Sequence, residues 1–158
     1  MVFFSAGEVI EIAIQIEKNG LSFYRSLAKS TDQEDLRSLF NHLASEEEIH
    51  LMDFQSLYDS LKTYQPHITD EEEYYGYIKM LADMNIFTKK EGVDSVIKKI
   101  KELEEALDVA IGFEKDSIIF YTELIDLVQG SQKKAVKEII RQEKGHLRKL
   151  FLMAIEMG

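Results

Sequence analysis

The stretch SEEEIHLMDF, residues 45–54, places a carboxylate and an imidazole in the apolar seam of a long helical pattern. Apolar residues recur every three or four positions on both sides of it, which is the repeat of one α-helical face. They are Leu36, Phe40 and Leu43 before the stretch, and Phe54, Leu57 and Leu61 within and after it. The seam is broken at Glu47 and His50. Because charged side chains are rarely buried without a partner, these two residues need a chemical reason.

The composition excludes several classes of site. The chain has 158 residues, of which 45% are hydrophobic, and this is enough for one domain with a sizeable core. It has no cysteine, which excludes disulfides, zinc–thiolate sites and iron–sulfur clusters. Its net charge of −10 argues against a nucleic acid or an anionic membrane as the main partner. Any metal ion must therefore be bound by Glu, Asp and His.

The pattern of the chain predicts an all-α fold. One proline and eight glycines leave long uninterrupted periodic segments, at about residues 5–29, 31–63, 93–128 and 131–157. Short links within the first and last pairs favour antiparallel hairpins, whereas the link 64–92 can run the length of a bundle. We therefore predict a single domain over residues 1–158. It is an antiparallel four-helix bundle of two hairpins, about 5–63 and 93–157, with one long crossover, 64–92.

Local sequence signals predict where two of the long helices begin. Thr31 is the expected N-cap of the second long helix, with Glu34 as its capping-box partner, and Ser131 is expected to cap the last helix after Gly130.

The apolar segment 80–87 is expected to pack outside the bundle or against a second copy in a homodimer. No signal peptide and no apolar run of about 20 residues is apparent, so we expect a cytoplasmic protein without a membrane span.

The two halves of the chain resemble each other. The segment IAIQIEKNGLSFYRSL, residues 12–27, aligns with VAIGFEKDSIIFYTEL, residues 109–124, and seven of sixteen positions are identical. The alignment pairs residues of the first and third long helices, and a second alignment pairs residues of the second and fourth. The pairs are Glu17 with Glu114, Tyr24 with Tyr121, Glu47 with Glu143, and His50 with His146. A repeated hairpin predicts a bundle with pseudo-twofold symmetry.

Six side chains interrupt the apolar seams near the middle of the four helices. Residues i and i+3 lie about 60° apart around a helix and about 4.5 Å along it, so the Glu and His of each Glu-x-x-His can aim at one point. Four buried carboxylates together are prohibitive unless cations compensate them, and two divalent ions make the cluster neutral. We predict a dinuclear site in which two glutamates each cap one metal and two bridge both. The caps are Glu17 and Glu114, the bridges Glu47 and Glu143, and the imidazole ligands His50 and His146.

This arrangement resembles the ferritin-like di-iron carboxylate proteins, and within them the rubrerythrin group, on the motifs EKNGLSFY, EEEIH, EKDSIIFY and QEKGH. The resemblance implies a ferritin-like bundle, two Fe ions and an oxidoreductase that reduces peroxide or dioxygen. Mn or Zn can occupy the same ligands. Electrons would come from a separate donor protein, because the chain lacks the cysteines of a rubredoxin-like domain. Rubrerythrins also tend to carry a further Glu at the position of Ser117, so peroxidase activity is implied less strongly than the metal site.

Two other functions stay open at this stage. One is a ferritin-like protein that binds or handles iron without acting as a peroxidase. The other is a metal-free helical interaction module on a di-iron scaffold, for which removal of the buried glutamates should raise stability. Metal ions are the expected partners of both an oxidoreductase and an iron-handling protein. We expect neither nucleic acid nor a membrane as a partner.

Residues beside the six ligands allow more than one interpretation. Tyr24 and Tyr121 share the ligand face, where they hydrogen-bond a ligand carboxylate, relay an electron or pack as core aromatics. We favour packing, or at most a supporting contact to a ligand. Gly20 and Ser117 occupy matched positions, where small residues leave space for an oxidant or allow close helix contact.

Other polar residues near the motifs are assigned to the surface. Four of them fall off the buried stripe and are expected to be solvated, namely Glu46, Glu48, His42 and His67. Asp53 and Arg148 lie close to the histidines in sequence and are candidates to hydrogen-bond them.

Overall fold

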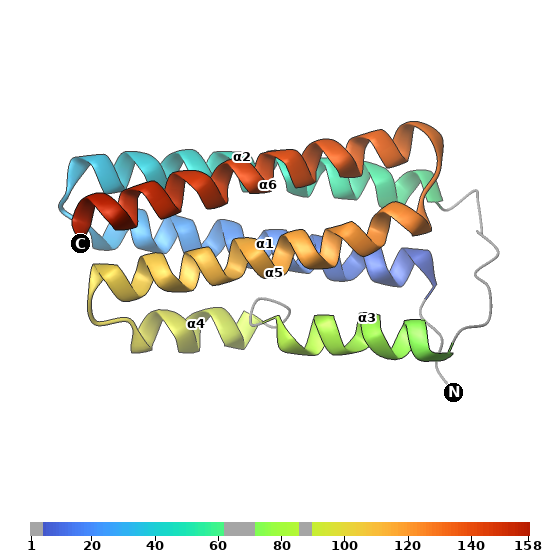
Figure 1. Ribbon diagram of the computed structural model, residues 1–158, viewed down its shortest axis with the longest axis horizontal. Coiled ribbons are helices and arrows are strands. Elements are labelled where there is room, and N and C mark those ends of the chain that lie inside the picture. Colours follow the sequence, from blue (N-terminus) through green and yellow to red (C-terminus); the bar gives the residue numbers. More distant parts are fainter. Residues whose placement is uncertain (1–4, 62–71, 86–89) are drawn as a thin grey trace.

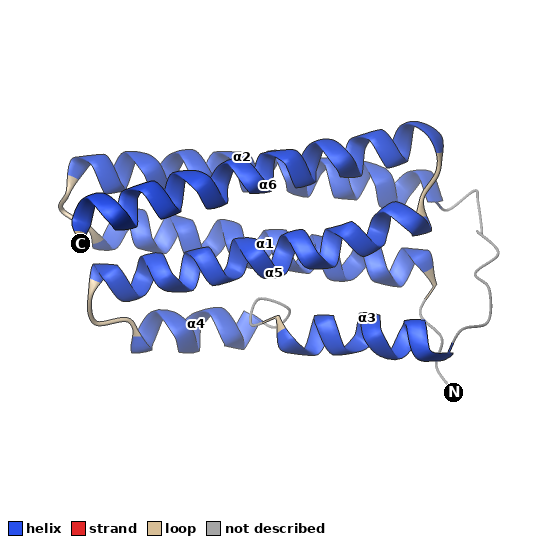
Figure 2. Cartoon of the chain, in the orientation of Figure 1, coloured by secondary structure: helices blue, strands red, loops and turns tan. Residues whose placement is uncertain are grey.

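The computed structural model describes residues 5–61, 72–85 and 90–158, and these residues form helices joined by loops (Figure 2). The helices are α1 (Ala6–Ser30), α2 (Glu34–Leu61), α3 (Glu72–Met84), α4 (Lys90–Lys99), α5 (Leu103–Leu127) and α6 (Gly130–Met157). Four of them, α1, α2, α5 and α6, are 25 to 28 residues long and lie side by side (Figure 1). The prediction of an all-α bundle is therefore confirmed.

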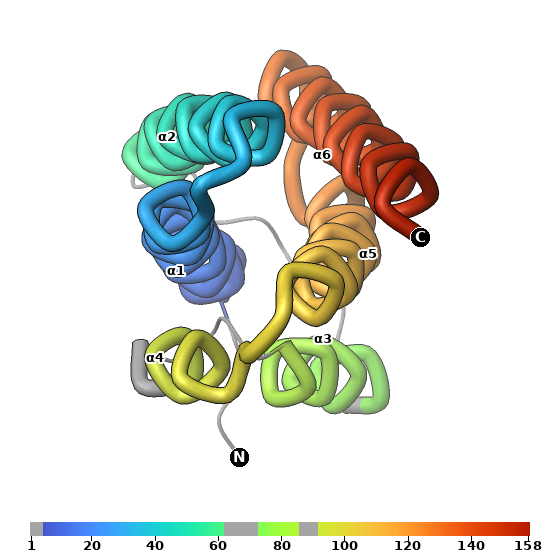
Figure 3. Tube along the Cα trace, turned by 90° about the vertical axis from the view of Figure 1, so that its left-hand side faces the viewer, coloured from blue at the N-terminus to red at the C-terminus, as the bar shows by residue number. Residues whose placement is uncertain are grey.

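The bundle consists of two hairpins that pack against each other. Helices α1 and α2 form the first hairpin, and α5 and α6 form the second. Across the interface α1 contacts α5 and α2 contacts α6, and both pairs are antiparallel (Figures 1 and 3). Helices α3 and α4 lie outside the four-helix core, with α3 against α5 and α4 against α1 (Figure 3). Every long helix thus has one face turned to the bundle interior.

The second hairpin begins later than the sequence predicts. Its first helix was expected over 93–128, but the chain leaves the helical conformation at residues 100–102 and separates α4 from α5. An uninterrupted helix of that length would extend about 54 Å. Helix α5 is instead 25 residues long, the same length as α1. The break lets Val93 of α4 become buried against α1. The predicted hairpin 93–157 is therefore corrected to 103–157, and the crossover contains both α3 and α4.

Two predicted helix caps are wrong, although the helices are present. Thr31 is the C-cap of α1 and has extended backbone, and its hydroxyl accepts a hydrogen bond from the amide of Gln33. Helix α2 then starts at Glu34, two residues later than an N-cap at Thr31 would give. At α6 the N-cap is Gln129, and Ser131 lies inside the first turn. Gly130 has a φ of +56°, a conformation that favours glycine, so the turn is made there.

Aromatic rings fill the core on both sides of the bundle centre. Phe40 and Phe54 lie two turns before and two turns after Glu47 on α2, and both are fully buried. The ring of Phe40 stacks on Tyr24 at 6.4 Å between centroids, and that of Phe54 meets Tyr121 at 4.8 Å. These apolar layers keep water from the centre along the bundle axis.

The segment predicted to lie outside the bundle is partly described. In residues 80–85, Ala82 is buried while Met80 and Met84 are exposed, and residues 86 and 87 lie outside the described residues. His67 also lies outside them. Within the described ranges, no helix combines the length and apolar character that a membrane span requires.

Candidate metal centre

All six predicted ligands meet in the middle of the bundle. Each of the four long helices supplies its residues from a central turn, where the apolar repeat directs that face inward. Their exposure is 0% for Glu17, Glu47, His50, Glu114 and Glu143, and 2% for His146. The anomaly in the seam of α2 is therefore repeated on three further helices at the same depth.

The Nδ1 atoms of the two histidines face the carboxylates. His50 Nδ1 lies 2.7 Å from Glu143 Oε1 and 3.7 Å from Glu17 Oε2. His146 Nδ1 lies 3.3 Å from Glu143 Oε2, 3.4 Å from Glu47 Oε1 and 3.7 Å from Glu114 Oε1. The two imidazole rings stack with centroids 5.5 Å apart. Both histidines thus present the same ring nitrogen to one cluster of oxygens.

The ligand atoms divide into two overlapping groups of four. In each group the atoms lie within 4.8 Å of one another, so each encloses a space suited to one ion. Atoms on opposite sides of a bound ion are about 4 Å apart, because metal–oxygen and metal–nitrogen distances are about 2.0–2.2 Å. The first group is Glu17, Glu47, His50 and Glu143, and the second is Glu47, Glu114, Glu143 and His146. Glu47 and Glu143 belong to both groups, as the predicted bridging role requires, and that role stays a prediction.

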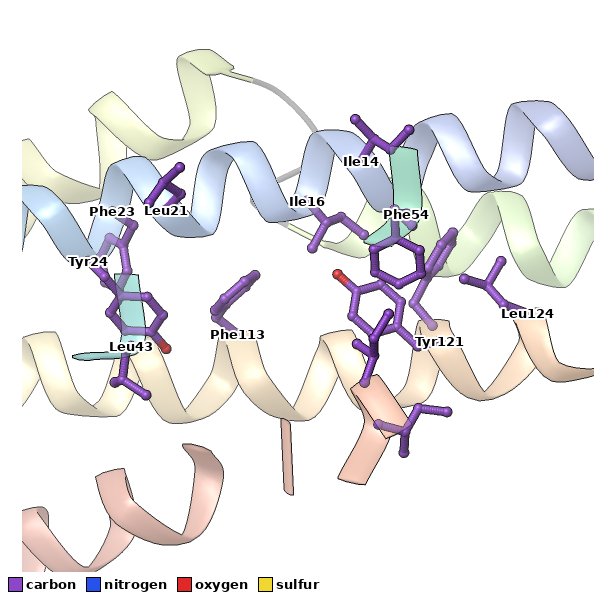
Figure 4. Close-up of a cluster of buried hydrophobic side chains, with 14 of the residues drawn as sticks. Ile14, Ile16, Leu21, Phe23, Tyr24, Leu43, Phe54, Phe113, Tyr121 and Leu124 are labelled. Atoms are coloured by element: carbon purple, nitrogen blue, oxygen red, sulfur yellow. The ribbon is translucent and has the colours of Figure 1, made fainter. Parts of the chain in front are cut away.

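Two tyrosines hold the outer carboxylates across the hairpin interface. Tyr24 on α1 donates a hydrogen bond to Glu114 Oε1 on α5 at 2.5 Å, and Tyr121 on α5 donates one to Glu17 Oε1 on α1. Figure 4 shows the two hydroxyls pointing toward the space between the rings, on either side of Phe113. Burial and the neighbouring carboxylates raise the pKa of both tyrosines well above 10.0. Both tyrosines are therefore hydrogen-bond donors to ligand carboxylates as well as core aromatics.

The remaining carboxylate oxygens are the ones that suit metal ions. Within the part of the chain that the structure describes, both oxygens of Glu47 and one oxygen each of Glu17 and Glu114 are buried without a hydrogen-bond partner. A buried oxygen of this kind is costly unless a proton or a cation compensates it. Glu17 and Glu114 each use one oxygen for a tyrosine and leave the other facing the cluster. The donor set therefore fits two oxygen- and nitrogen-preferring divalent ions.

Burial raises the pKa of two of the glutamates. For Glu47, desolvation is the largest cause, and the charges of Glu17 and Glu143 add to it, so its pKa lies well above 4.5. For Glu114, desolvation is again the largest cause, followed by the charge of Glu143. In the metal-free protein these two carboxyls consequently keep their protons to a higher pH than a free glutamate does.

The histidines are also proton carriers in the metal-free cluster. Burial opposes the charge on His50, but hydrogen bonds and charges from Glu143 and Glu17 outweigh it and raise its pKa to about 12. The same balance, with Glu114 and Glu143 as partners, raises the pKa of His146 to about 10. Burial acts to raise the pKa of Glu143, but its hydrogen bonds to neighbouring groups outweigh that effect and lower it. Bound divalent ions would thus displace protons that the metal-free cluster holds.

Gly20 and Ser117 lie beside the cluster but differ in their surroundings. A Cβ atom at Gly20 would lie 2.6 Å from Phe113 Cζ and 3.0 Å from Glu47 Oε2. Gly20 therefore serves the close approach of α1 to the Phe113 ring on α5. Ser117 is fully buried, and its hydroxyl has no hydrogen-bond partner among the described residues.

The histidines have partners that the sequence did not suggest. Gln142 Oε1 lies 2.7 Å from His50 Nε2, and Glu46 Oε2 lies 3.9 Å from His146 Nε2. The side chain of Glu46 is 30% exposed, so it is only partly solvated, less than the sequence predicts. Glu48 is solvated as expected and pairs with Arg25 at 3.4 Å. The internal repeat held a signal, because Glu46 and Gln142 occupy equivalent positions, each directly before the motif glutamate.

The other polar candidates are not part of the site. Asp53 and Arg148 are exposed, and the contacts to the histidines come from other residues. His42 is exposed as predicted, and its Nε2 lies 2.7 Å from Nζ of Lys149.

Comparisons with known proteins agree with this geometry. The rubrerythrin family model matches residues 8–154. A crystal structure of a candidate ferritin-like diiron-carboxylate protein from Thermotoga maritima is 30% identical, with a TM-score of 0.71 and coverage of 100% of this chain and 99% of that one. A hypothetical protein from Pyrococcus furiosus shares the fold at 21% identity and a TM-score of 0.57, over 96% and 89% of the two chains. No curated protein was found to match. With four buried glutamates and two histidines grouped to hold metal ions, the chain belongs to the rubrerythrin family of ferritin-like proteins.

Proposed function

We propose that this protein is a di-iron oxidoreductase that reduces hydrogen peroxide or dioxygen with electrons from a separate donor protein. The observation that carries the proposal is the pair of overlapping ligand groups that share Glu47 and Glu143. Carboxylate and imidazole ligands without thiolate suit iron or manganese and also accept zinc. Two ferrous ions, when bound, supply two electrons, which together with two protons reduce one hydrogen peroxide molecule to two water molecules.

The side chains of this protein have three tasks in such a reaction. The six ligands would hold the ions through carboxylate oxygens and through the Nδ1 atom of each histidine that faces them. Tyr24 and Tyr121 orient the outer carboxylates, since each hydroxyl fixes one carboxylate oxygen and leaves the second for the metal. The aromatic layers of Phe40 and Phe54 exclude bulk water from the centre. The 158 residues contain no cysteine, so they hold no thiolate-bound electron-transfer centre, which supports an external donor.

The first measurement is iron content after anaerobic loading of metal-free protein with Fe(II). We expect about two iron ions per chain. A Glu143→Gln variant should bind less iron, because it weakens a ligand common to both groups. The matched control is Glu48→Gln, an exposed position on α2 next to Glu47, which should keep full loading. No iron in the unaltered protein would refute the metal centre and favour a helical interaction module.

The second measurement is stopped-flow mixing of the iron-loaded protein with hydrogen peroxide and, separately, with dioxygen. Oxidation of the bound iron faster than that of free Fe(II) supports the oxidoreductase. Oxidation no faster than in free solution, with two ions bound, would instead favour an iron-handling protein. Sizing of the same sample distinguishes the proposed homodimer from a many-subunit shell.

A further inference from the structure

The outward-facing nitrogens of the two histidines meet residues from the opposite hairpin. His50 on α2 meets Gln142 on α6, with Nε2 and Oε1 2.7 Å apart. His146 on α6 faces Glu46 on α2, with Nε2 and Oε2 3.9 Å apart. Each contacting residue immediately precedes the motif glutamate of its own helix. The pseudo-twofold symmetry of the fold therefore extends one layer beyond the ligands, but with an amide on one side and a carboxylate on the other.

A short hydrogen-bond network fixes the orientation of Gln142. Its amide nitrogen donates to Glu138 Oε1 at 3.0 Å, and Arg141 holds the same carboxylate through bonds of 2.5 and 2.9 Å. A carboxylate accepts hydrogen bonds, so the NH₂ group of Gln142 must face Glu138 and its oxygen must face His50. His50 then donates from Nε2. The lone pair of the neutral imidazole is left on Nδ1, which is the atom that faces the carboxylate cluster.

Glu46 favours the same tautomer of His146 that Gln142 favours for His50, but it affects the electron-donating strength of the imidazole differently. Among the described residues His146 Nε2 has no hydrogen-bond partner, so Glu46 acts through its charge, which favours a proton on the facing Nε2 and hence the same tautomer. It adds a negative charge that the amide of Gln142 does not have. A carboxylate acceptor makes the imidazole a stronger electron donor to a bound metal than an amide acceptor does. At 3.9 Å the contact is longer than a hydrogen bond, but the half-buried position keeps the charge close to the ring.

We propose that Gln142 and Glu46 are positioning residues that hold each histidine in the Nδ1-ligating tautomer, and that their difference makes the metal ion at His146 the more tightly bound of the two. The inference rests on the proposed metal centre. It adds an inequivalence between two sites whose six direct ligands are related by the internal repeat.

The test is stepwise Co(II) binding to the metal-free, full-length protein, followed by calorimetry and by the visible absorption of the ion. The unaltered protein should bind two ions in two resolved steps. Glu46→Gln should weaken the tighter step by about 10-fold and bring the two steps together, because altered partners of ligating histidines cost about 10–100-fold in affinity. Glu48→Gln is the matched control, with the same chemical change on the same helix but pointing to solvent, and should change neither step.

Two further measurements separate positioning from general stability. The double variant Glu46→Gln with Gln142→Glu should restore two resolved steps, because it moves the charge to the other histidine. In paramagnetic proton spectra of the Co(II) protein, each Nε2–H should give one exchangeable signal, and Glu46→Gln should shift only one of them. Two equal steps in the unaltered protein, or identical behaviour of Glu46→Gln and Glu48→Gln, would overturn this inference alone. No Co(II) binding, together with no iron loading, would overturn it along with the metal centre.

Discussion

Replacement of Gly20 by alanine tests how closely the two hairpins approach at the site. The added Cβ would lie 2.6 Å from Phe113 Cζ, 2.9 Å from Phe113 Cε1 and 3.0 Å from Glu47 Oε2. Real Cβ atoms do not approach other atoms to 2.6 Å, so the Phe113 ring must shift. That ring is 2% exposed and packs edge-on against Tyr24 at 6.1 Å, so it has little room to shift. Overpacking of this kind costs about 1–3 kcal/mol.

Alanine also stabilises a helix relative to glycine, and a control is needed to separate the two effects. Gly112 and Gly145 are in helices, and an added Cβ would meet nothing within 4 Å at either position. Gly112→Ala and Gly145→Ala should stabilise the protein by up to about 1 kcal/mol. Gly20→Ala gains the same helix stabilisation but is also destabilised by overpacking. It should therefore be less stable than either control by about 1–3 kcal/mol.

Urea unfolding of the metal-free proteins measures the difference directly, and thermal unfolding gives a second estimate. For a chain of this size each kcal/mol corresponds to about 2–4 °C in Tm. Gly20→Ala should also bind less iron, because the new methyl group displaces the Glu47 carboxylate. Equal stability of Gly20→Ala and Gly112→Ala would refute the reasoning. It would mean that Phe113 can move freely and that Gly20 is not required for the approach of α1 to α5.

Three further predictions follow from the hydrogen bonds and pKa shifts of the site. Tyr121→Phe removes the donor to Glu17 and should lower the unfolding free energy of the loaded protein by about 1.5–3 kcal/mol in urea titrations, whereas exposed Tyr77→Phe should change it by less than about 0.5 kcal/mol. Metal loading at pH 7 should release about two protons from His50 and His146, and any protons held by Glu47 and Glu114 would add to these. Calorimetry in buffers of different ionisation enthalpy measures the release, and a value near zero would show that the cluster is not protonated beforehand. The pKa of His50 is raised from 6.5 to about 12, so its contribution to metal-free stability is complete below pH 6.5 and is lost as the pH rises toward 12. The raised pKa of Glu47 acts in the same direction. Thermal unfolding of metal-free protein should therefore give a lower Tm at pH 9 than at pH 6, and the opposite order would contradict the assignment.

The fold and the ligand set could be predicted because both depend on patterns within single helices. The apolar repeat shows which face of each helix is buried, and an ionisable residue on that face is conspicuous. The internal repeat then relates Glu17 to Glu114 and Glu47 to Glu143. The structure brings these residues together at the depth that the helical repeat requires. That they bind metal remains a prediction.

The errors fall where contacts between helices decide the outcome. Nothing in the local sequence at 100–102 is a helix breaker, and the chain bends there because α4 packs against α1. Glu46 lies off the buried stripe of α2, but the side chain reaches toward α6, where it faces His146. A helical wheel gives the position of a residue around the axis of its own helix, and it contains no information about the neighbouring helices.

The sequence by itself determined the helical class, the repeated hairpin and the identity of the six residues in the seam, because a 3.6-residue period assigns side chains to a face. Only the tertiary structure decided which atoms meet across the hairpin interface. Tyr24 donates to Glu114 rather than to Glu17 on its own helix, and Tyr121 does the reverse. Side chains two turns apart on one helix are about 10 Å apart, whereas the antiparallel packing of α1 and α5 brings a residue of one helix beside a residue of the other. These contacts depend on the relative translation and rotation of the two hairpins, which are set by the packing of the whole core.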